Sequence, residues 1–416
     1  MLPIALCHAT IVLPDRVTAQ PLVVEHGRVA AAEPLGAWAL DLSGHLIYPG
    51  LINAHDHLQL NNIPRLPEHE PFPNSYAWME AFQPYFGDPA VAEARKAPEA
   101  ARLWQGGLKN LLCGATTVAH HDPWAPALDD PAFPVRLLRR FGWSHSLGLG
   151  MQNAECRMQK DAAQETDHSA FSILHFALPR YGPPVVESFR ATPADQPWII
   201  HLAEGTDAVA AAELAQLDAL GCLAANTVLV HGVGLSAADV DRMIACGAAV
   251  VWCPASNLTM LGRTLNPRRL FDPGRLLVGS DSRISGSRDL LDELHIAAQQ
   301  GGLAPAELLR AVTVDASRVL AMPDAGGLEP GQRADLVIVR ANRGDPYRAL
   351  IGLRRADIRA VVRDGAPAIA DPDFAGWFAA SGVEAVRVTL DGRPKLLARV
   401  LARPDAIELE PGLGKY

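Results

Sequence analysis

Short apolar runs alternate with longer amphipathic stretches through the middle of the chain, from residue 50 to about residue 335. The clearest apolar runs are 116–119, 198–200, 227–230, 249–252 and 276–279, and stretches such as AVAAAELAQLDAL and AADVDRMIACG lie between such runs. Strands that alternate with helices form a parallel sheet covered by helices. Eight such units of roughly 35 residues each predict a (β/α)8 barrel of the TIM type.

Both ends of the chain have a different pattern, in which short apolar segments follow one another with turns between them. This pattern is typical of strands, so we expect a small β-sandwich domain built from both termini. The predicted division is residues 1–48 for the N-terminal part of the sandwich, 49–335 for the barrel and 336–416 for the C-terminal part. The last part includes extra strands from about Val383, to which the sequence assigns no function.

Composition excludes several classes of function. The 416 residues are 49% hydrophobic and 20% charged, which is ordinary for a soluble globular protein with a large core. The net charge is −9 and no basic tract occurs, so we expect no nucleic-acid or membrane partner. The six cysteines form no CxxC pair and the N-terminus lacks the features of a signal peptide. The sequence therefore predicts a cytoplasmic location without a disulfide framework.

Five polar residues stand at or just beyond the ends of apolar runs. They are His55 and His57 after LIYPGLINA, His201 after PWII, His231 after TVLV and Asp281 after RLLVGS. Each alone has an ordinary structural interpretation, such as a core histidine or a helix N-cap. In a barrel, however, the C-terminal strand ends converge on one face. Together these imidazoles and the carboxylate indicate a site for catalytic zinc or iron.

Five motifs in a fixed order, YPGLINAHDH, HLAE, HGVG, WCPASN and VGSDS, resemble the amidohydrolase superfamily. The closest resemblance is to its mononuclear aminohydrolase branch, which contains cytosine, guanine and adenosine-type deaminases and related chlorohydrolases. The closing segment GGLEPGQRADLVIV is also similar to that family's return from barrel to β domain. The resemblance implies a homodimer and the following roles: metal ligands His55, His57, His201 and Asp281, proton-transferring acid Glu204, orienting histidine His231, and Asp281 also as the proton acceptor.

The number of metal ions follows from a missing residue. Two-metal members of the superfamily bridge their ions with a carboxylated lysine near the end of the fourth strand. Between residues 115 and 200 the only lysine is Lys160, which lies in the polar stretch CRMQKDAAQ and not at the end of an apolar run. We therefore expect one divalent metal ion per chain, zinc first, with iron and manganese as alternatives.

The substrate is less well defined by the sequence. Arg180 and Arg283 can each hold an anionic substrate or pair with a carboxylate on the barrel rim, and the sequence leaves both interpretations open. Further candidate substrate contacts are Gln59, His120 and His121.

The leading hypothesis is a metal-dependent hydrolase that uses metal-activated water to deaminate a cyclic amidine or heteroaromatic amine. The partner is then a small molecule, anionic if the arginines face the site. The first alternative is hydrolysis of an amide or lactam, or displacement of another leaving group. The second is a non-catalytic scaffold descended from such an enzyme, which should lack some ligands, whereas this chain retains them all.

Overall fold

The computed structural model describes residues 3–32, 36–147, 182–342 and 344–416. Its central part contains eight parallel strands in the described residues. Three form one sheet in the order β10-β9-β8 and five form another in the order β11-β12-β13-β14-β15. The bounds are β8 Leu51–Asp56, β9 Ala115–His120, β10 Arg136–Leu137, β11 Gly142–Ser146, β12 Trp198–Leu202, β13 Thr227–His231, β14 Ala249–Trp252 and β15 Leu276–Val278.

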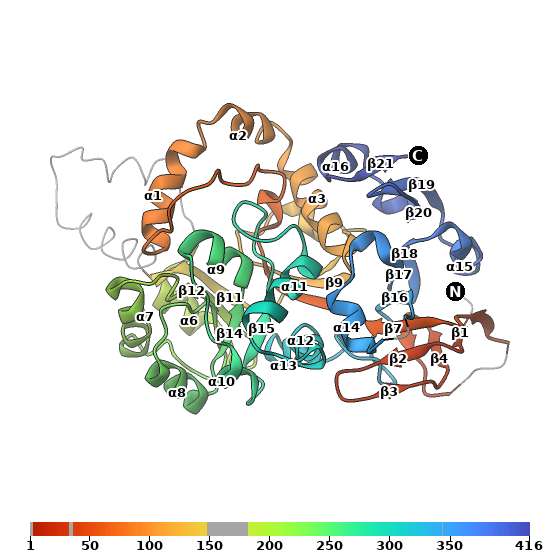
Figure 1. The fold of residues 1–416 in the computed structure, drawn as a ribbon, viewed down its shortest axis with the longest axis horizontal. Helices are drawn as coiled ribbons and strands as arrows, with labels where there is room; N and C mark the ends of the chain where they lie inside the picture. Colours follow the sequence, from red (N-terminus) through yellow and green to blue (C-terminus); the bar gives the residue numbers. More distant parts are fainter. Residues whose placement is uncertain (1–2, 33–35, 148–181, 343) are drawn as a thin grey trace.

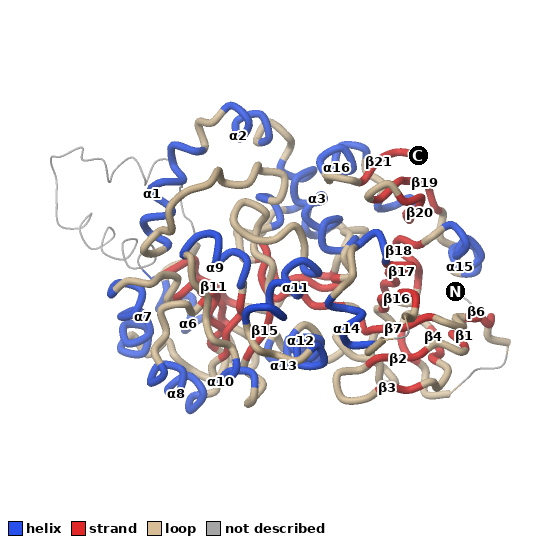
Figure 2. The backbone as a smooth tube through the Cα atoms, in the orientation of Figure 1, coloured by secondary structure: helices blue, strands red, loops and turns tan. Residues whose placement is uncertain are grey.

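The two sheets meet where β8 lies beside β15, and the amide of Asp281 donates a hydrogen bond to the carbonyl of His55 at 3.1 Å. Strands buried along their whole length read as continuous apolar runs, and the predicted runs 116–119, 198–200, 227–230, 249–252 and 276–279 all fall on these strands. The predicted α/β class is thereby confirmed, with parallel strands inside and helices outside (Figures 1 and 2).

Helices follow the strands and cover the barrel (Figure 1). Local signals set several of their ends. The helix α8 begins with a capping box between Ser236 and Asp239 and ends at Gly247, whose φ of 82° is favoured by glycine. The bounds are α1 Ser75–Tyr85, α2 Pro89–Ala94, α3 Glu99–Leu112, α6 Val185–Ala191, α7 Ala208–Ala219, α8 Ala237–Cys246, α9 Pro254–Leu261, α10 Arg268–Phe271, α11 Leu290–Gln300, α12 Pro305–Ala311 and α13 Val314–Val319. No helix in the described ranges is long and apolar enough to cross a membrane.

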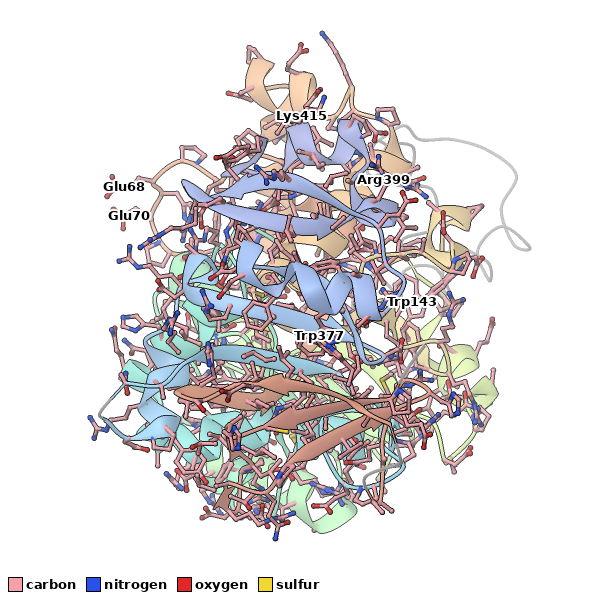
Figure 3. The ribbon with its side chains drawn as sticks, turned by 90° about the vertical axis from the view of Figure 1, so that its right-hand side faces the viewer. Glu68, Glu70, Trp143, Trp377, Arg399 and Lys415 are labelled. Carbon is pink, nitrogen blue, oxygen red and sulfur yellow. The ribbon has the colours of Figure 1, made fainter. Side chains whose placement is uncertain are left out.

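Strands from both chain ends share one nine-stranded sheet, in the order β21-β19-β20-β18-β17-β16-β7-β2-β3. Figure 3 shows the N-terminal strands beside the C-terminal ones. Its strands are β2 Thr10–Val12, β3 Val17–Thr18, β7 His45–Pro49, β16 Leu336–Arg340, β17 Ile358–Arg363, β18 Ala366–Ala370, β19 Ala385–Leu390, β20 Arg393–Ala398 and β21 Leu413–Lys415. A second sheet, β5-β4-β1-β6, consists of Ile4–Cys7 (β1), Leu22–Glu25 (β4), Arg28–Val29 (β5) and Trp38–Asp41 (β6).

Strand limits support the predicted division of the chain. The strand β7 of the terminal sheet ends at Pro49, β8 of the barrel begins at Leu51, and β16 of the terminal sheet begins at Leu336. We therefore keep the boundaries after residues 48 and 335 as a proposal. Three short helices complete this part of the chain: α14 Pro346–Ile351, α15 Ala375–Ala380 and α16 Pro404–Leu409.

The C-terminal extension contacts the barrel. The helix α16 packs against α3, and Trp104 on α3 donates its indole N–H to the carbonyl of Leu401 at 3.1 Å. Glu410, just after α16, accepts a 2.6 Å hydrogen bond from the side chain of Gln105. The C-terminal extension, to which the sequence assigns no function, thus packs against the helix that precedes β9.

Candidate metal and catalytic site

Four predicted metal ligands meet at the C-terminal ends of β8, β12 and β15. The Nε2 atoms of His55 and His201 are 3.2 Å apart. The Oδ1 atom of Asp281 lies 3.8 Å from His55 Nε2 and 3.6 Å from His57 Nε2. All four residues are buried. Donor atoms this close together, from residues up to 226 positions apart, are arranged around a common centre.

Hydrogen bonds on the outer side of the imidazoles fix which nitrogen faces this centre. His57 Nδ1 lies 2.7 Å from Asp122 Oδ2, and His201 Nδ1 lies 2.8 Å from the backbone carbonyl of His145. A carboxylate or carbonyl on one ring nitrogen leaves the other as the ligand, which is the usual arrangement around metal-binding histidines. The Nε2 atoms of His57 and His201 are therefore the ones available to a metal.

The protonation of these groups suits a cation. Burial and the neighbouring imidazoles hold the pKa values of His55 and His201 well below the ordinary value, so both rings are neutral with a free lone pair. Burial also lowers the pKa of His57, but the charge and hydrogen bond of Asp122 outweigh it and raise this pKa to about 9. The His57 ring therefore favours a positive charge, which a bound cation would supply in place of the ring proton. Three imidazoles and one carboxylate are a donor set that fits zinc, so these residues fit the implied metal.

Asp281 is held as an anion. Its Oδ2 atom accepts hydrogen bonds from the hydroxyls of Ser256 at 2.6 Å and Ser285 at 3.1 Å, and Oδ1 accepts from the backbone N–H of Ser282 at 2.7 Å. Burial alone raises the pKa of a carboxyl, but His57, His231 and these hydrogen bonds more than compensate, and the pKa of Asp281 is lowered.

Glu204 and His231 form a second pair beside these groups. His231 Nε2 lies 3.5 Å from Glu204 Oε1, while His231 Nδ1 lies 2.9 Å from the side-chain oxygen of Asn257. Burial is the main cause of a raised pKa at Glu204, and it outweighs the lowering effect of His231. Glu204 is therefore a carboxyl that tends to hold its proton, next to an imidazole whose orientation is fixed.

Backbone strain marks the same strand ends. Ala203, His231 and Asp281 have φ values of 52°, 76° and 54°, in the left-handed region that non-glycine residues seldom adopt. Each stands directly at or just beyond the end of β12, β13 or β15. Strain of this kind persists where the surroundings enforce it and is common at functional sites.

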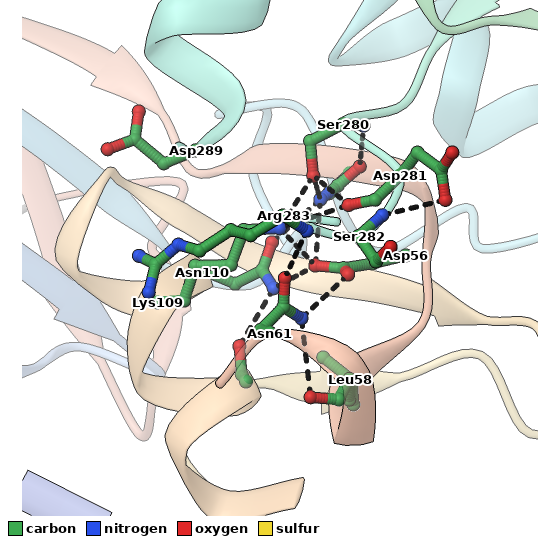
Figure 4. A network of polar contacts seen from close by, with 12 residues as sticks. Asp56, Leu58, Asn61, Lys109, Asn110, Ser280, Asp281, Ser282, Arg283 and Asp289 are labelled. Carbon is green, nitrogen blue, oxygen red and sulfur yellow. Dashed lines mark hydrogen bonds and ion pairs between the residues drawn. The ribbon is translucent and has the colours of Figure 1, made fainter. Parts of the chain in front are cut away.

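A buried charged network supports the site from behind (Figure 4). Lys109 on α3 forms an ion pair with Asp56 at 3.0 Å, and both side chains are fully buried. Lys109 also donates to the backbone carbonyl of Asp281 at 3.1 Å, and Asn110 donates to Asp56 at 2.7 Å. Asp56 stands between His55 and His57, so the network ties α3 to both ends of the predicted ligand set.

A cavity of about 280 Å³ opens in front of these groups. His57, His201, Glu204, His231 and Asp281 form its polar floor. The rest of the described lining comes from the segment 59–102, from the loop after Asp281 and from His145. The helices α1 and α3 contribute the largest part of this wall: Trp78, Met79, Phe82 and Arg102, with Phe86 and Arg95 between them.

The structure places the predicted substrate-contacting residues in different positions relative to the cavity. Gln59 lines the cavity, and its side chain hydrogen-bonds to Asp122. His120 and His121 are buried behind the floor. The Nδ1 of His120 accepts from the backbone N–H of Leu58 at 3.4 Å, and His121 Nε2 lies 3.1 Å from the carbonyl of Ser144. Neither histidine is among the described residues that line the cavity, and their predicted contact with substrate stays a prediction.

Of the two predicted arginines, Arg283 is in the described structure and pairs with a carboxylate. The two terminal guanidinium nitrogens of Arg283 each donate a 2.8 Å hydrogen bond to the carboxylate of Glu410, and its Nε donates to the carbonyl of Arg288. Arg283 therefore takes the alternative that the sequence left open, a pair with a carboxylate, because the C-terminal extension brings Glu410 to it. Arg180 lies outside the described residues.

Several site residues were missed by the sequence analysis. Asp122 was visible only as the end of the run TTVAHHD, and its partner His57 is 65 positions away. Asn257 and Ser256 stand inside the WCPASN motif, which carried the resemblance without a role for either side chain. The aromatic residues of α1 had a signal in the composition of SYAWMEAFQPYF, but no spacing that distinguishes a pocket wall from a core helix.

The fold and the clustered donor atoms are those of a metal-dependent hydrolase built on an α/β barrel. Comparison with known proteins agrees: residues 186–368 match the amidohydrolase family. A 5-methylthioadenosine/S-adenosylhomocysteine deaminase of Natronomonas pharaonis is 28% identical over 359 residues, which cover 79% of each chain. An 8-oxoguanine deaminase of Pseudomonas aeruginosa is 25% identical over 397 residues, covering 79% of this chain and 85% of that protein.

Solved structures show the same fold. An adenosine deaminase from Xanthomonas campestris with bound zinc superposes with a TM-score of 0.63 and 20% sequence identity, covering 92% of this chain and 97% of its own. The resemblance to the amidohydrolase superfamily that the motifs predicted is thereby confirmed, and the chain is a metal-dependent enzyme of the aminohydrolase type.

Proposed function

We propose that the protein is a metal-dependent deaminase of a heteroaromatic amine or cyclic amidine. The observation that carries this proposal is the arrangement at the cavity floor, where Glu204 and His231 lie beside the predicted ligand set. Relatives named as deaminases of 5-methylthioadenosine, S-adenosylhomocysteine and 8-oxoguanine support the same reaction class.

The metal is best held by His55, His57, His201 and Asp281, whose donor atoms face one another. Zinc is the ion we propose, since the donor set suits it and a structural neighbour contains it. When bound, a divalent ion lowers the pKa of water and so supplies a nucleophile near neutral pH.

The surrounding residues move the protons. The ionised Asp281 accepts the proton that water loses as it attacks the ring carbon. Glu204, whose pKa is raised by burial, donates a proton to the ring or leaving nitrogen. His231, held by Asn257, orients the oxygen on which charge develops. The products are a cyclic carbonyl compound and ammonia.

The test is release of ammonia by the zinc-loaded protein from a panel of purines, pyrimidines, pterins and triazines. We expect a signal on one ring class that disappears in His55→Ala. A zinc-retaining protein that releases ammonia from none of these rings would overturn the proposal. Hydrolysis of an amide, lactam or chlorinated ring by the same preparation would then identify the alternative reaction.

A cytoplasmic location, a homodimer and the absence of a nucleic-acid partner remain part of the proposal. Sedimentation analysis of the purified chain would test the dimer directly.

A further inference from the structure

Two arginines stand on the helical wall of the cavity without a carboxylate partner. Arg95 follows α2 and Arg102 lies in the first turn of α3, and both line the cavity with Gln59. Neither forms an ion pair with any carboxylate in the part of the chain that the structure describes. Glu99, one helical turn before Arg102, is exposed and does not pair with it.

The guanidinium of Arg102 is positioned but not saturated. Its Nη1 donates to the backbone carbonyl of Gln59 at 3.0 Å, which fixes the group against the wall. Its Nε–H is buried and has no acceptor among the described residues. A buried donor without an acceptor is unfavourable, so an acceptor is expected to reach it from the cavity.

Two other arginines with largely buried side chains, Arg283 and Arg355, are each paired with carboxylates. Arg283 is paired with both oxygens of Glu410, and Arg355 is paired with Glu410 and Asp391. Arg102 forms no such ion pair in the described residues. Burial lowers its pKa, the charge of Glu99 opposes this change, and the positive charge of Arg95 adds to it. Two cations that repel each other across a cavity wall are stabilised by an anion placed between them.

Arg95 is oriented toward the same space. Its guanidinium carbon lies 4.6 Å from the centre of the Phe86 ring, a cation–π contact that holds the charge at the cavity wall. Lys96, the next residue, is exposed and paired with Glu93 at 2.6 Å, and it does not line the cavity. Lys96 is therefore a neighbouring positive charge that does not face the cavity, and it can serve as a control.

We propose that the substrate carries a carboxylate or phosphate group on a part remote from the reacting carbon, and that Arg102, assisted by Arg95, binds this group. The proposal rests on the proposed deamination, since it names the substrate class of that same site. A guanidinium suits either anion, because its planar N–H groups bind two oxygens at once.

Pairs of substrates that differ in the anionic group test the proposed preference for a carboxylate or phosphate. The zinc-loaded protein is assayed for ammonia release from adenosine against adenosine 5′-monophosphate, 5′-methylthioadenosine against S-adenosylhomocysteine, and pterin against pterin-6-carboxylate. In the ring series that is turned over, we expect the member that carries the carboxylate or phosphate to have a kcat/KM at least about tenfold higher, since hydrogen bonds to charged groups are strong. The phosphate and carboxylate pairs separate the two anions.

Variants assign the preference to Arg102. Arg102→Gln should raise KM for the anionic member and reduce the preference at least about tenfold, and Arg102→Lys should restore part of it. Lys96→Gln removes a neighbouring charge of the same sign and should keep the full preference. Equal use of both members by the unaltered protein, or a preference that survives in Arg102→Gln, would overturn the proposal.

A binding measurement separates this inference from the reaction itself. Calorimetry with benzoate and its uncharged analogue benzamide needs no turnover. We expect the zinc-loaded protein and Lys96→Gln to bind benzoate at least about tenfold more tightly than Arg102→Gln does. If ammonia is never released but this difference is found, the deaminase proposal fails and the anion site stands. Equal benzoate binding by all three proteins contradicts the anion site.

Discussion

The floor and the helical wall of one cavity are built on different principles. On the floor, strand ends supply histidines and carboxylates, and each of His57, His201, His231 and Asp281 is fixed by a hydrogen bond to a neighbouring residue. The wall comes from α1 to α3 and combines aromatic side chains with arginines that lack carboxylate partners. The difference indicates that the floor performs the chemistry and that the wall selects the molecule.

The largest effect is expected on the floor, at Glu204. Glu204→Gln removes the proton donor and keeps the shape of the side chain, so kcat should fall by about 10²–10⁴. Steady-state ammonia release measures kcat, and zinc content measured by atomic absorption serves as the control. A loss of less than about threefold with zinc retained would show that Glu204 does not transfer the proton.

A smaller effect is expected behind the floor, at Asp122. Asp122→Asn keeps an acceptor for His57 Nδ1 but removes the negative charge, and zinc affinity should fall roughly 10–100-fold. Competition with a fluorescent zinc chelator gives the dissociation constant. Asp130→Asn, at a carboxylate paired with Arg403 away from the site, is the control and should leave zinc affinity unchanged. Equal affinity in both variants would contradict the role of Asp122.

On the wall, substitution should act on binding. Trp78 lines the cavity and its ring centre lies 4.2 Å from that of Phe82. Trp78→Leu removes an aromatic face worth roughly 0.5–1.5 kcal/mol, so KM should rise about threefold to tenfold. The effect should be concentrated in KM, in contrast to Glu204→Gln. A fall in kcat as large as that of Glu204→Gln would remove the distinction between floor and wall.

An effect of a different kind, on stability against pH and not on activity, is expected at Glu293. This fully buried carboxyl has a pKa raised by burial from 4.5 to about 8. Its Oε1 accepts from the backbone N–H of Ala255, and its Oε2 lies 2.6 Å from Ser287 Oγ. Because the Ser287 hydroxyl also donates to the carbonyl of Asp289, the protonated carboxyl is the natural donor to Ser287.

The raised pKa of Glu293 determines whether the stability of the protein rises or falls with pH. A raised carboxyl pKa in the folded state contributes stability that is full below about pH 4.5 and is lost as the pH rises to about 8. Glu293→Gln should not show this loss, so its stability relative to the unaltered protein should increase by up to about 1.4 kcal/mol per pH unit across that window. Urea unfolding at pH 5, 6, 7 and 8 measures it. Parallel pH profiles for the two proteins would show that Glu293 is ionised throughout.

Local patterns predicted the strands and the floor. Apolar runs are short and continuous, so the pattern identified β9 and β12 to β15, and each catalytic candidate is adjacent in sequence to the strand that positions it. The sequence could not predict side-chain contacts between residues that are far apart in the chain. Arg283 was left between two roles because its partner Glu410 is 127 positions away, in an extension that had no assigned function.

The helical wall had no such local signal. An amphipathic helix buries its apolar face whether it covers a core or lines a cavity, and Trp78 and Phe82 read the same in both cases. Arg102 was overlooked for the same reason, since an arginine in the first turn of a helix is ordinarily exposed to solvent. What distinguishes Arg102 is that no carboxylate among the described residues pairs with it, and no sequence pattern records this.

Location of the metal tests the division between floor and wall most directly. Anomalous X-ray diffraction at the zinc edge, on crystals of the zinc-loaded protein, should show one ion bound by His55, His57, His201 and Asp281, with Glu204 and His231 unbound beside it. His55 and His201 also lie close to His231, which makes a different set of three imidazoles available. An ion held by those three histidines, or a second ion in the cavity, would contradict the account.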